Sequence, residues 1–440
     1  MQRVSIAGYP VIVVRVAWGS AVGSTLWTMH PQERVRQGGL WRGLRTVVSP
    51  SRRIEMKRLV FLTNIPTPYR CAFYNELTKE SARKGVGLTV LYCARREPNR
   101  HWQISPSAFL HDAVFLDRGF HPTFGGASFH LNWEVGSLLR RLQPEIVVCA
   151  GSWNMPTNWF ALRTARAIGA RTVFWSEGHA DAVRNPLGPV AWIRRRFLRA
   201  YDGYAVPNRR SAEWILGEAQ QEKPIVLLPN TVDGEFYRRH GARERQLARK
   251  RLGIPASTRL LVQVSALEPW KGVRELLTAF VSLRSELATG AMLVLVGDGS
   301  LRGNLERGVD AAGCADCVKV VGHVDQELVR EWLMAADAFV LNTFRDPNPL
   351  APIEASFAKL PLVLSARAGN HDELLTPSTG FSIADPSYPG GALERFFKTE
   401  WSQLSTMGEA AYENAARTFV INGVCAALLE QLDRLVSGRG

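Results

Sequence analysis

The stretch that decides the fold runs from residue 342 to residue 365 and reads NTFRDPNPLAPIEASFAKLPLVLS. A short apolar run precedes it at residues 338–341, and a second apolar run closes it at residues 362–364. Between these runs, the pattern predicts a proline-rich loop followed by a helix over residues 349–359. Strand, loop, helix and strand in this order form the unit from which parallel sheets are built.

Two carboxylates flank the start of this predicted helix. Asp346 lies in the loop, and Glu354, eight residues later, lies about one turn inside the helix. The amides of Leu350 and Ala351 would be among the free donors at the helix start, where an anion can bind. Since a carboxylate accepts hydrogen bonds from two neighbouring hydroxyls, Glu354 could hold a ribose diol and Asp346 the hydroxyls of a sugar. Either acid alone is better explained as a complement to the helix dipole, but their spacing together with the neighbouring motifs favours a ligand.

Apolar runs alternate with helical patterns along most of the chain. Strands are predicted first at residues 59–63, 88–92, 113–116, 146–150, 172–175, 203–206 and 225–228. Residues 238–251 are strongly charged, and we interpret them as a solvated linker and helix. A second series of strands is predicted at residues 260–264, 292–296, 318–321, 338–341, 362–364 and 380–383. Helical patterns between the strands include residues 69–82, 133–142, 159–168 and 210–216.

This alternation predicts an α/β protein with two doubly wound parallel-sheet domains. We divide the chain into four parts. Residues 1–55 form a basic extension without a fold of its own, and residues 406–440 form helices that pack back toward the first domain. The two domains cover residues 56–234 and 235–405. Because ligands of such sheets bind at the carboxyl ends of the strands, we expect one deep cleft between the domains.

The charge and the cysteines limit the class of protein. The formal net charge is +14, and residues 1–55 contribute +6 of it through eight arginines against two glutamates. This excess favours an anionic partner, but no nucleic-acid recognition motif appears, so we expect no nucleic-acid partner. No run of eighteen apolar residues occurs, so no membrane span is expected. Six cysteines in 440 residues do not form a disulfide framework, which indicates a cytoplasmic protein. The single C-x-x-C at residues 314–317 has no second pair near it, so zinc is not expected.

One basic segment could contact a membrane. Trp192 and Phe197 lie among four arginines in a helical pattern. A charge run is usually a solvated face, but aromatic and basic residues together also suit docking on anionic lipid. We favour the second interpretation and expect a peripheral location on the inner face of the cell membrane, through Arg194, Arg195, Arg196 and Arg199.

Several turns carry recognisable motifs. Residues 265–273 read SALEPWKGV, residues 296–301 read VGDGSL, and residues 321–324 read VGHV. Together with Asp346, Glu354, and the loops at residues 370–373 and 379–381, they resemble glycosyltransferases of family 4. This resemblance implies the GT-B fold of two facing Rossmann-like domains. It also implies transfer of a sugar from a nucleotide-diphosphate sugar with retention of the anomeric configuration.

The resemblance assigns roles in the second domain. Lys271 matches the lysine of a basic pair that meets the donor diphosphate, while the usual arginine is Ala266 here. Asp346 and Glu354 occupy the two acid positions of the E-x7-E element, with aspartate replacing the first glutamate. We expect Lys271, Asp346 and Glu354 to serve in catalysis. The donor would be bound by Gly272, Gly297, Gly299, Gly322, His323, Asn348, Leu350 and Ala351.

The first domain carries the expected acceptor side. Residues 63–70, TNIPTPYR, stand where the family has a glycine-rich loop, and Pro68 could open a helix there with Thr67 as its cap. The acceptor-side residues would be Asn64, Tyr69 and Arg70. Residues 175–179 end a strand where relatives place a histidine facing the donor sugar. Glu177 or His179 could serve as that catalytic residue, and the sequence does not decide between them.

The function predicted is therefore transfer of a sugar to a glycan or lipid-linked acceptor in surface polysaccharide synthesis. No Asp-x-Asp pair occurs in the chain, so we expect metal-independent activity, with no cofactor beyond the nucleotide sugar as co-substrate. Two alternatives stay open. A nucleotide-sugar epimerase of similar fold would convert the donor without an acceptor, and a non-catalytic nucleotide-sugar-binding protein would bind the donor without turnover.

Overall fold

The computed structural model describes residues 3–6, 9–12, 55–97, 104–124, 127–178, 187–284 and 290–438. The chain forms two units, Met1–Pro50 and Ser51–Gly440. The first unit contains an antiparallel hairpin of β1 (Arg3–Ile6) and β2 (Tyr9–Ile12), which the sequence did not predict. The second unit carries both predicted sheets and is described from here on.

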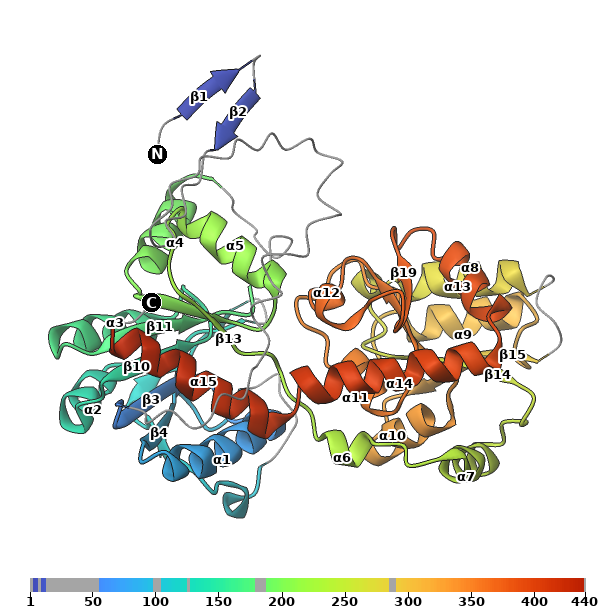
Figure 1. Cartoon of the computed structure of the whole chain (residues 1–440), viewed down its shortest axis with the longest axis horizontal. Helices are drawn as coiled ribbons and strands as arrows, with labels where there is room; N and C mark the ends of the chain where they lie inside the picture. Colours follow the sequence, from blue (N-terminus) through green and yellow to red (C-terminus); the bar gives the residue numbers. More distant parts are fainter. Residues whose placement is uncertain are drawn as a thin grey trace, which may run out of the picture. The chain divides into compact units, whose positions relative to one another are not determined.

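The first sheet has seven parallel strands in the order β13-β12-β11-β10-β3-β4-β5 (Figure 1). The strands are β3 (Arg58–Thr63), β4 (Gly87–Tyr92), β5 (Asp112–Phe115), β10 (Ile146–Ala150), β11 (Arg171–Trp175), β12 (Gly203–Val206) and β13 (Ile225–Leu227). One face is covered by α1 (Pro68–Arg83) and α15 (Ile421–Val436). The other face is covered by α2 (Val135–Leu142), α3 (Pro156–Ala167), α4 (Pro189–Arg199) and α5 (Arg209–Ala219).

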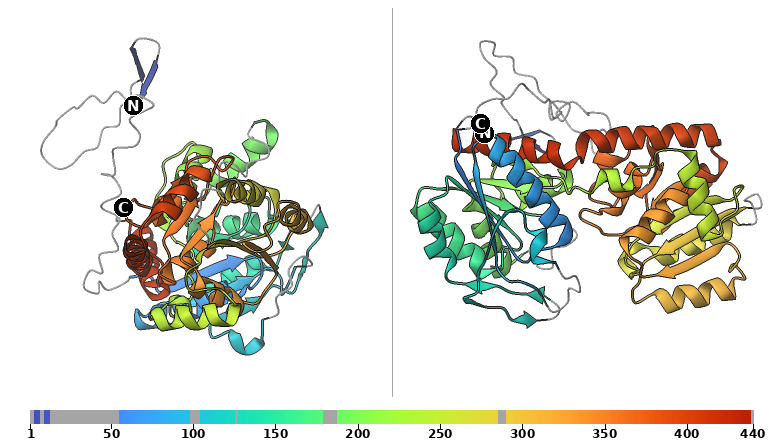
Figure 2. Two further views of the ribbon diagram at one scale, coloured as in Figure 1. Left: turned by 90° about the vertical axis from the view of Figure 1, so that its right-hand side faces the viewer. Right: turned by 90° about the horizontal axis from the view of Figure 1, so that it is seen from below.

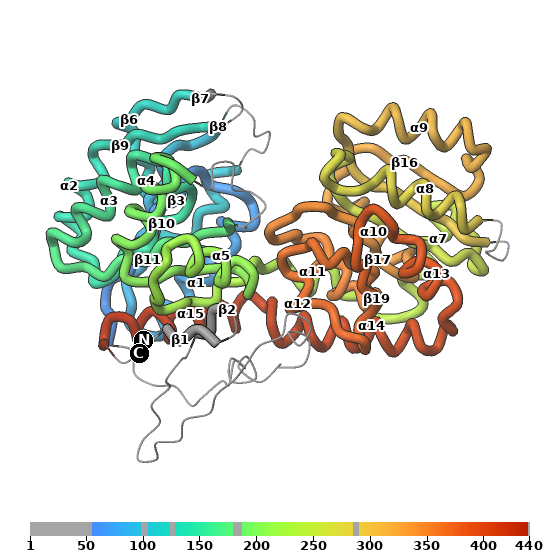
Figure 3. The backbone as a smooth tube through the Cα atoms, turned by 90° about the horizontal axis from the view of Figure 1, so that it is seen from above, coloured from blue at the N-terminus to red at the C-terminus, as the bar shows by residue number. Residues whose placement is uncertain are grey.

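The second sheet has six parallel strands in the order β16-β15-β14-β17-β18-β19. The strands are β14 (Arg259–Val264), β15 (Ala291–Val296), β16 (Val318–Gly322), β17 (Ala338–Leu341), β18 (Leu362–Ser365) and β19 (Gly380–Ile383). One face packs on α8 (Val273–Leu283), α9 (Arg302–Ala311) and α13 (Gly390–Lys398). The opposite face packs on α10 (Gln326–Ala335), α11 (Ala351–Phe357) and α14 (Trp401–Thr418), which can be followed in Figure 3.

The prediction of two doubly wound parallel sheets is confirmed. Each of the thirteen predicted strands is present, with its ends within one residue of the predicted bounds. The reason is burial: strands such as β10 and β17 are buried at every position, so their sequences are unbroken apolar runs. The sequence did not predict four strands of two residues each, because two residues show no periodicity: β6 (Gly119–Phe120), β7 (Thr123–Phe124), β8 (Ala127–Ser128) and β9 (Leu131–Asn132).

Each sheet has one point where the strand order reverses. In the first sheet the chain starts at β3, moves outward through β4 and β5, and then returns to β10 on the other side of β3. In the second sheet it starts at β14, moves through β15 and β16, and returns to β17. In open parallel sheets, ligands bind beyond the carboxyl ends of the strands at such a reversal. The candidate site should therefore involve the loops after β3 and β10 and those after β14 and β17.

The C-terminal helices connect the cores of both sheets. α14 contributes Ala415 to the core against β17 and α11, whereas α15 buries Cys425 and Leu428 against α1 and the first sheet. The ribbon views show α15 lying along α1 (Figures 1 and 2). Hydrogen bonds add to this packing, for instance from the Met56 amide to Asp433 Oδ1 at 2.9 Å.

The interpretation of residues 238–251 as a solvated linker and helix needs a correction at two arginines. The segment forms a linker and α7 (Ala242–Leu252), but Arg249 is buried and donates to the carbonyls of Ala335 and Thr258 at 2.9 and 2.8 Å. Arg245 and Arg249 both pair with the buried carboxylate of Asp337. A run of charged residues in the sequence does not show which of them pairs with a buried acid about ninety residues further along the chain.

Among the described residues, no helix combines the length and apolar character needed to cross a membrane.

Candidate functional site

The turn after β14 brings Lys271 to the carboxyl end of the second sheet. A short 3-10 helix η4 (Pro269–Lys271) ends at Gly272, which takes a left-handed conformation with φ of 60° and begins α8. A Cβ atom on Gly272 would lie 1.8 Å from the carbonyl oxygen of Asn342. Glycine is therefore required at this position because two backbone segments touch, whether or not a ligand also approaches.

The loop after β17 is attached to this turn by several hydrogen bonds. The buried side chain of Asn342 donates from Nδ2 to Gly272 O at 2.9 Å. The hydroxyl of Thr343 and the amide of Phe344 both donate to Trp270 O, at 3.0 and 2.9 Å. The two loops at the reversal point of the sheet therefore form one structure, and the side chains that they carry hold defined positions.

Lys271 and Asp346 meet across these two loops. The ammonium group of Lys271 pairs with Asp346 Oδ2, and both side chains are largely buried. The carbonyl of Asp346 accepts from the amide of Gly369 at 2.8 Å. Both residues were predicted for the site, but the sequence assigned them to different parts of a ligand and did not predict that they pair. In this arrangement, an anionic ligand would compete with Asp346 for the lysine.

Glu354 lies in the first turn of α11, as predicted. Its carboxyl group hydrogen-bonds with the hydroxyl of Tyr237, on α6 (Gly234–Tyr237). Burial raises the pKa of Glu354 to about 7. The Tyr237 hydroxyl also accepts from Gln326 Nε2 at 3.1 Å, so it is held from a second side. The sequence analysis missed Tyr237, because its contact with Glu354 joins segments more than one hundred residues apart.

The start of α11 offers few but well-defined donors. Leu350 caps the helix, the position after Ala351 is a proline without an N–H, and the Ile353 amide donates back to Leu350 O at 2.8 Å. Helix geometry leaves the amides of Leu350 and Ala351 without intrahelical acceptors. The side-chain amide nitrogen of Asn348 is buried and has no acceptor in the described part of the chain. These three donors suit the oxygen atoms of a ligand.

At several of the other predicted donor-binding positions, the fold itself requires or favours glycine. A Cβ on Gly297 would lie 1.9 Å from Ser265 O, and one on Gly299 would lie 2.6 Å from Leu267 O. Gly322 has φ of +83°, which favours glycine, and His323 after it is exposed. The sequence reasoning missed Glu268, which accepts from Ser300 N and Oγ at 3.0 and 2.7 Å and so ties the two turns together.

The expected acceptor-side residues lie at the reversal point of the first sheet. Thr67 caps α1 with its hydroxyl and Pro68 opens the helix, as predicted. The guanidinium of Arg70 donates to Glu177 Oε1 at 2.9 Å and stacks over the ring of Trp175, with Cζ 3.6 Å from the centroid. Tyr69 is partly exposed beside it. The structure therefore brings Arg70 and Glu177 together, whereas His179 lies outside the described residues.

Unpaired polar atoms mark this end of the first sheet. Asn64 Oδ1, Arg70 Nη1 and Trp175 Nε1 are all buried without a hydrogen-bond partner among the described residues. Asn64 follows β3 and Trp175 ends β11, and these two strands flank β10, so the atoms come from strand ends at the same edge of the sheet. Buried polar groups without partners are costly, and a polar ligand such as a carbohydrate would supply the missing partners.

The predicted membrane contact is wrong for one of its four arginines. Arg194 is buried in α4 and donates to Glu218 Oε1 at 2.9 Å. Arg199 is exposed, but it turns back onto α5, donating to Ala219 O and to Gln220 Oε1, each at 2.7 Å. Arg195 lies 3.4 Å from the same carboxylate of Glu218. The sequence pattern could not distinguish an arginine paired within the fold from one directed at a partner.

The second half of the chain matches a known family. Residues 244–413 match the family model described as glycosyl transferases group 1. This segment is therefore similar to the group 1 glycosyl transferases. It contains Lys271, Asp346 and Glu354, and all the predicted donor-binding residues.

Two curated relatives of the chain illustrate the similarity. TuaC of Bacillus subtilis (strain 168), a glycosyltransferase named for teichuronic acid biosynthesis, is 33% identical over 144 residues, 31% of this chain and 34% of TuaC. The D-inositol 3-phosphate glycosyltransferase of Streptomyces avermitilis is 28% identical over 208 residues, 45% of this chain and 44% of that protein. The match therefore spans less than half of the length of either relative.

Solved structures extend the similarity in fold to both sheets. HepE of Anabaena, crystallised with UDP, superposes with a TM-score of 0.66 at 14% identity over 85% of this chain and 99% of HepE. The sucrose-phosphate synthase of Thermosynechococcus elongatus gives a TM-score of 0.65 at 17% identity over 87% of this chain and all of that one. The chain thus has the GT-B fold, and residues 244–413 lie in its second half.

Proposed function

We propose that the chain transfers a sugar from a nucleotide-diphosphate sugar to an acceptor hydroxyl, with retention of configuration. The observation that carries this proposal is the meeting of Lys271 and Asp346 at the reversal point of the second sheet, with Glu354 one turn into the following helix. A cation, two acids and free amides at one strand edge are suited to a diphosphate with hydroxyl-rich groups at both ends.

The proposed chemistry needs the charge of the leaving group to be stabilised. The acceptor oxygen forms a bond to the anomeric carbon while the bond from that carbon to the diphosphate breaks. The acceptor proton passes to a phosphate oxygen on the same face. Lys271 and the amides of Leu350 and Ala351 would bear the developing phosphate charge, which is usually the largest catalytic contribution. Asp346 would orient the donor sugar and Glu354 the ribose. Because these groups supply the positive potential, we propose transfer without a metal.

The acceptor would lie against the first sheet. Arg70 and Glu177 form an ion pair there, and the unpaired atoms of Asn64 and Trp175 offer an acceptor and a donor for carbohydrate hydroxyls. TuaC is named for teichuronic acid biosynthesis, which supports a surface polysaccharide or a lipid-linked glycan as the acceptor class. HepE was solved with UDP and with UDP-glucose, so a uridine diphosphate sugar is the first donor to test.

The proposal is tested by following diphosphate release from a panel of nucleotide sugars, with and without lipid-linked acceptors. We expect release that depends on an acceptor and falls strongly in Glu354→Ala. Donor conversion without any acceptor would instead identify an epimerase. Donor binding without turnover would identify a binding protein.

We also propose peripheral contact with a membrane through the start of α4. The exposed apolar side chains Leu187, Trp192 and Ile193 lie there, together with Arg196, whose guanidinium is 5.9 Å from the Trp192 ring centroid. Co-sedimentation with phosphatidylglycerol vesicles should be lost in Trp192→Ala. It should be kept in Trp133→Ala, which removes a similarly exposed tryptophan elsewhere. Equal loss in both variants would refute this contact.

A further inference from the structure

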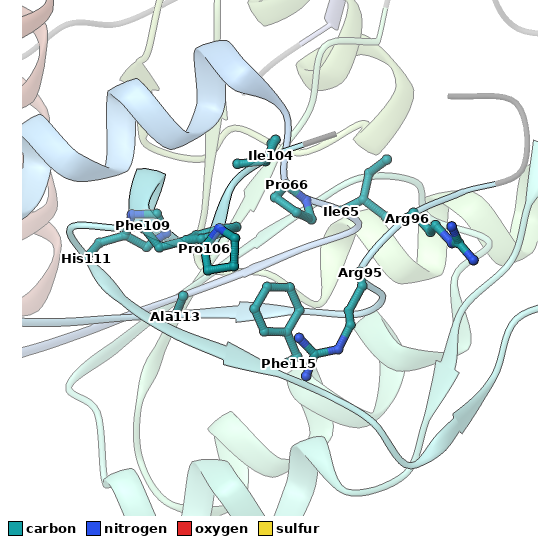
Figure 4. Close-up of a pocket in the computed structure, with 10 residues that line it drawn as sticks. All are labelled: Ile65, Pro66, Arg95, Arg96, Ile104, Pro106, Phe109, His111, Ala113 and Phe115. Atoms are coloured by element: carbon teal, nitrogen blue, oxygen red, sulfur yellow. The ribbon is translucent and has the colours of Figure 1, made fainter. Parts of the chain in front are cut away.

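A cavity in the first half of the chain lies beside the loop of the expected acceptor side. It has a volume of about 490 Å³ and lies over β5 (Figure 4). One wall is formed by Ile65 and Pro66, which directly follow Asn64 in the loop between β3 and α1. Nothing in the proposed transfer uses this cavity, yet it shares that loop with the acceptor side. Its volume is in the range of small-molecule sites.

The floor of the cavity is apolar. Ala113 and Phe115 are two residues apart in β5 and therefore point to the same face of the strand, and Phe109, which precedes the strand, lines the cavity with them. The rings of Phe109 and Phe115 pack edge to face with centroids 5.7 Å apart, and Phe115 stacks on Tyr92 at 5.2 Å. Ile104 and Pro106 lie across from this floor in Figure 4. Such a surface accommodates hydrocarbon.

His111 belongs to the same floor and adds no charge. Its Nε2 is 2.9 Å from the Tyr92 hydroxyl, and its Nδ1 is 2.6 Å from Asn75 Oδ1. Asn75 Oδ1 also accepts from the Leu110 amide at 2.9 Å. Burial lowers the pKa of His111 to about 4, so the ring is neutral at pH 7. With both ring nitrogens occupied, the imidazole offers the cavity only its carbon surface.

Two arginines supply all the formal charge that the described residues bring to the lining. Arg95 and Arg96 line the cavity, and no described aspartate or glutamate does. Arg95 lies with Cζ 4.3 Å from the Phe115 ring centroid, and its ion pair with Asp117 at 3.4 Å is exposed on both sides and therefore weak. Arg96 is exposed and makes no ion pair within the part of the chain that the structure describes. Guanidinium groups bind phosphate through two hydrogen bonds at once.

We propose that this cavity binds an isoprenoid phosphate or diphosphate, the lipid end of a lipid-linked acceptor. The apolar floor would take the branched hydrocarbon, and Arg95 and Arg96 would take the phosphate. The glycan attached to that phosphate would then lie along the Ile65–Pro66 wall toward Asn64 and Arg70. This inference rests on the proposed glycosyl transfer and specifies the class of its acceptor.

The test is calorimetric binding of farnesyl phosphate to the full chain. We expect saturable binding, with farnesol and inorganic phosphate each binding much more weakly, because each lacks one half of the recognised group. The double variant Arg95→Ala/Arg96→Ala should weaken binding by about tenfold or more, since a charge-assisted hydrogen bond contributes roughly that factor. The matched control is Arg140→Ala/Arg141→Ala, which removes an exposed adjacent pair from α2 and should bind like the unmodified chain.

A second variant tests the cavity itself. Ala113→Phe fills the floor and should abolish binding of farnesyl phosphate, while thermal unfolding shows whether the chain still folds. Unchanged affinity in both the arginine double variant and Ala113→Phe would overturn the proposal. So would the absence of farnesyl phosphate binding to the unmodified chain, whether or not the chain also binds phosphatidylglycerol vesicles through the start of α4.

Measurement of nucleotide binding distinguishes a failure of the cavity proposal from a failure of the transferase proposal. If UDP binds and donors turn over but farnesyl phosphate does not bind, the inference about the cavity fails while the transferase proposal stands. If farnesyl phosphate binds as expected but no nucleotide sugar binds or turns over, the transferase proposal fails. The cavity would then bind farnesyl phosphate for a function other than glycosyl transfer, and its role as an acceptor site would be overturned.

Discussion

The contact between the turn at Gly272 and the loop after β17 allows a sharp test of the site. In Gly272→Ala, the new Cβ would lie 1.8 Å from Asn342 O, whereas ordinary van der Waals contact begins near 3.4 Å. The atom that it meets is backbone, so no side chain can rotate away. The loop must move by about 1.6 Å relative to the turn. That movement would separate Lys271 from Asp346, which now pair across this contact.

The expected loss follows from this displacement. A misplacement of about 1 Å in catalytic groups can cost roughly a hundredfold in rate, so Gly272→Ala should reduce diphosphate release by about that factor or more. An alanine in the left-handed region also costs about 1–2 kcal/mol in stability. The stability loss alone would not explain a hundredfold loss of rate in protein that is still folded.

Gly85→Ala is the matched control. Gly85 has φ of +74°, and a Cβ there would meet nothing within 4 Å. It therefore carries the same backbone penalty without the clash, and it should lower the unfolding midpoint while leaving turnover unchanged. The assay is diphosphate release at saturating donor, with urea unfolding measured in parallel. If Gly272→Ala turned over within a few-fold of Gly85→Ala, the reasoning that this glycine contact positions Lys271 and Asp346 would be refuted.

Three further outcomes are expected. Affinity for UDP should rise between pH 6 and pH 8, because burial raises the pKa of Glu354 to about 7 and the carboxylate formed above that pH accepts better from ribose hydroxyls. Calorimetry at a series of pH values measures the midpoint of this rise. The midpoint should lie at a higher pH in Tyr237→Phe, since the tyrosine hydrogen bond lowers the pKa of Glu354. Asp337→Ala should lower the free energy of unfolding by about 3–5 kcal/mol, because it leaves Arg249 buried and uncompensated, whereas Asp316→Ala, at an exposed ion pair, should change it by about 1 kcal/mol or less. Turnover should persist in excess chelator, and its loss there would contradict the proposal of metal-free transfer.

The sequence was sufficient for the fold because parallel strands covered on both faces must be apolar throughout. β17, with its four buried residues, is an example, and its bounds were predicted without error. Helix ends were also predictable where a local signal existed, as at Thr67 and Pro68. The same reasoning placed Asp346 and Glu354 beside one helix start, because their separation along the chain is short.

Contacts between distant segments could not be predicted in the same way. The pairing of Lys271 with Asp346 joins residues seventy-five positions apart, and either side chain alone resembles an ordinary surface charge. Arg194 was predicted to face lipid, but a glutamate on the next helix holds it inside the fold. The role of a charged residue depends on the group with which it pairs. That group can be identified only in the folded structure, where distant segments of the chain lie side by side.

The loop that carries Asp346 is also held by the first half of the chain. Asn208, after β12, donates from Nδ2 to Pro347 O at 2.9 Å, and the Arg209 amide donates to Glu373 Oε1 at 2.7 Å. The guanidinium of Arg210 donates to Ala368 O at 3.3 Å, beside the residue whose amide binds Asp346. The proposed donor site therefore depends on residues of the proposed acceptor half that touch no ligand. A change in the first half can reach Asp346 through these backbone contacts, which gives a physical route by which acceptor binding could adjust the position of the donor.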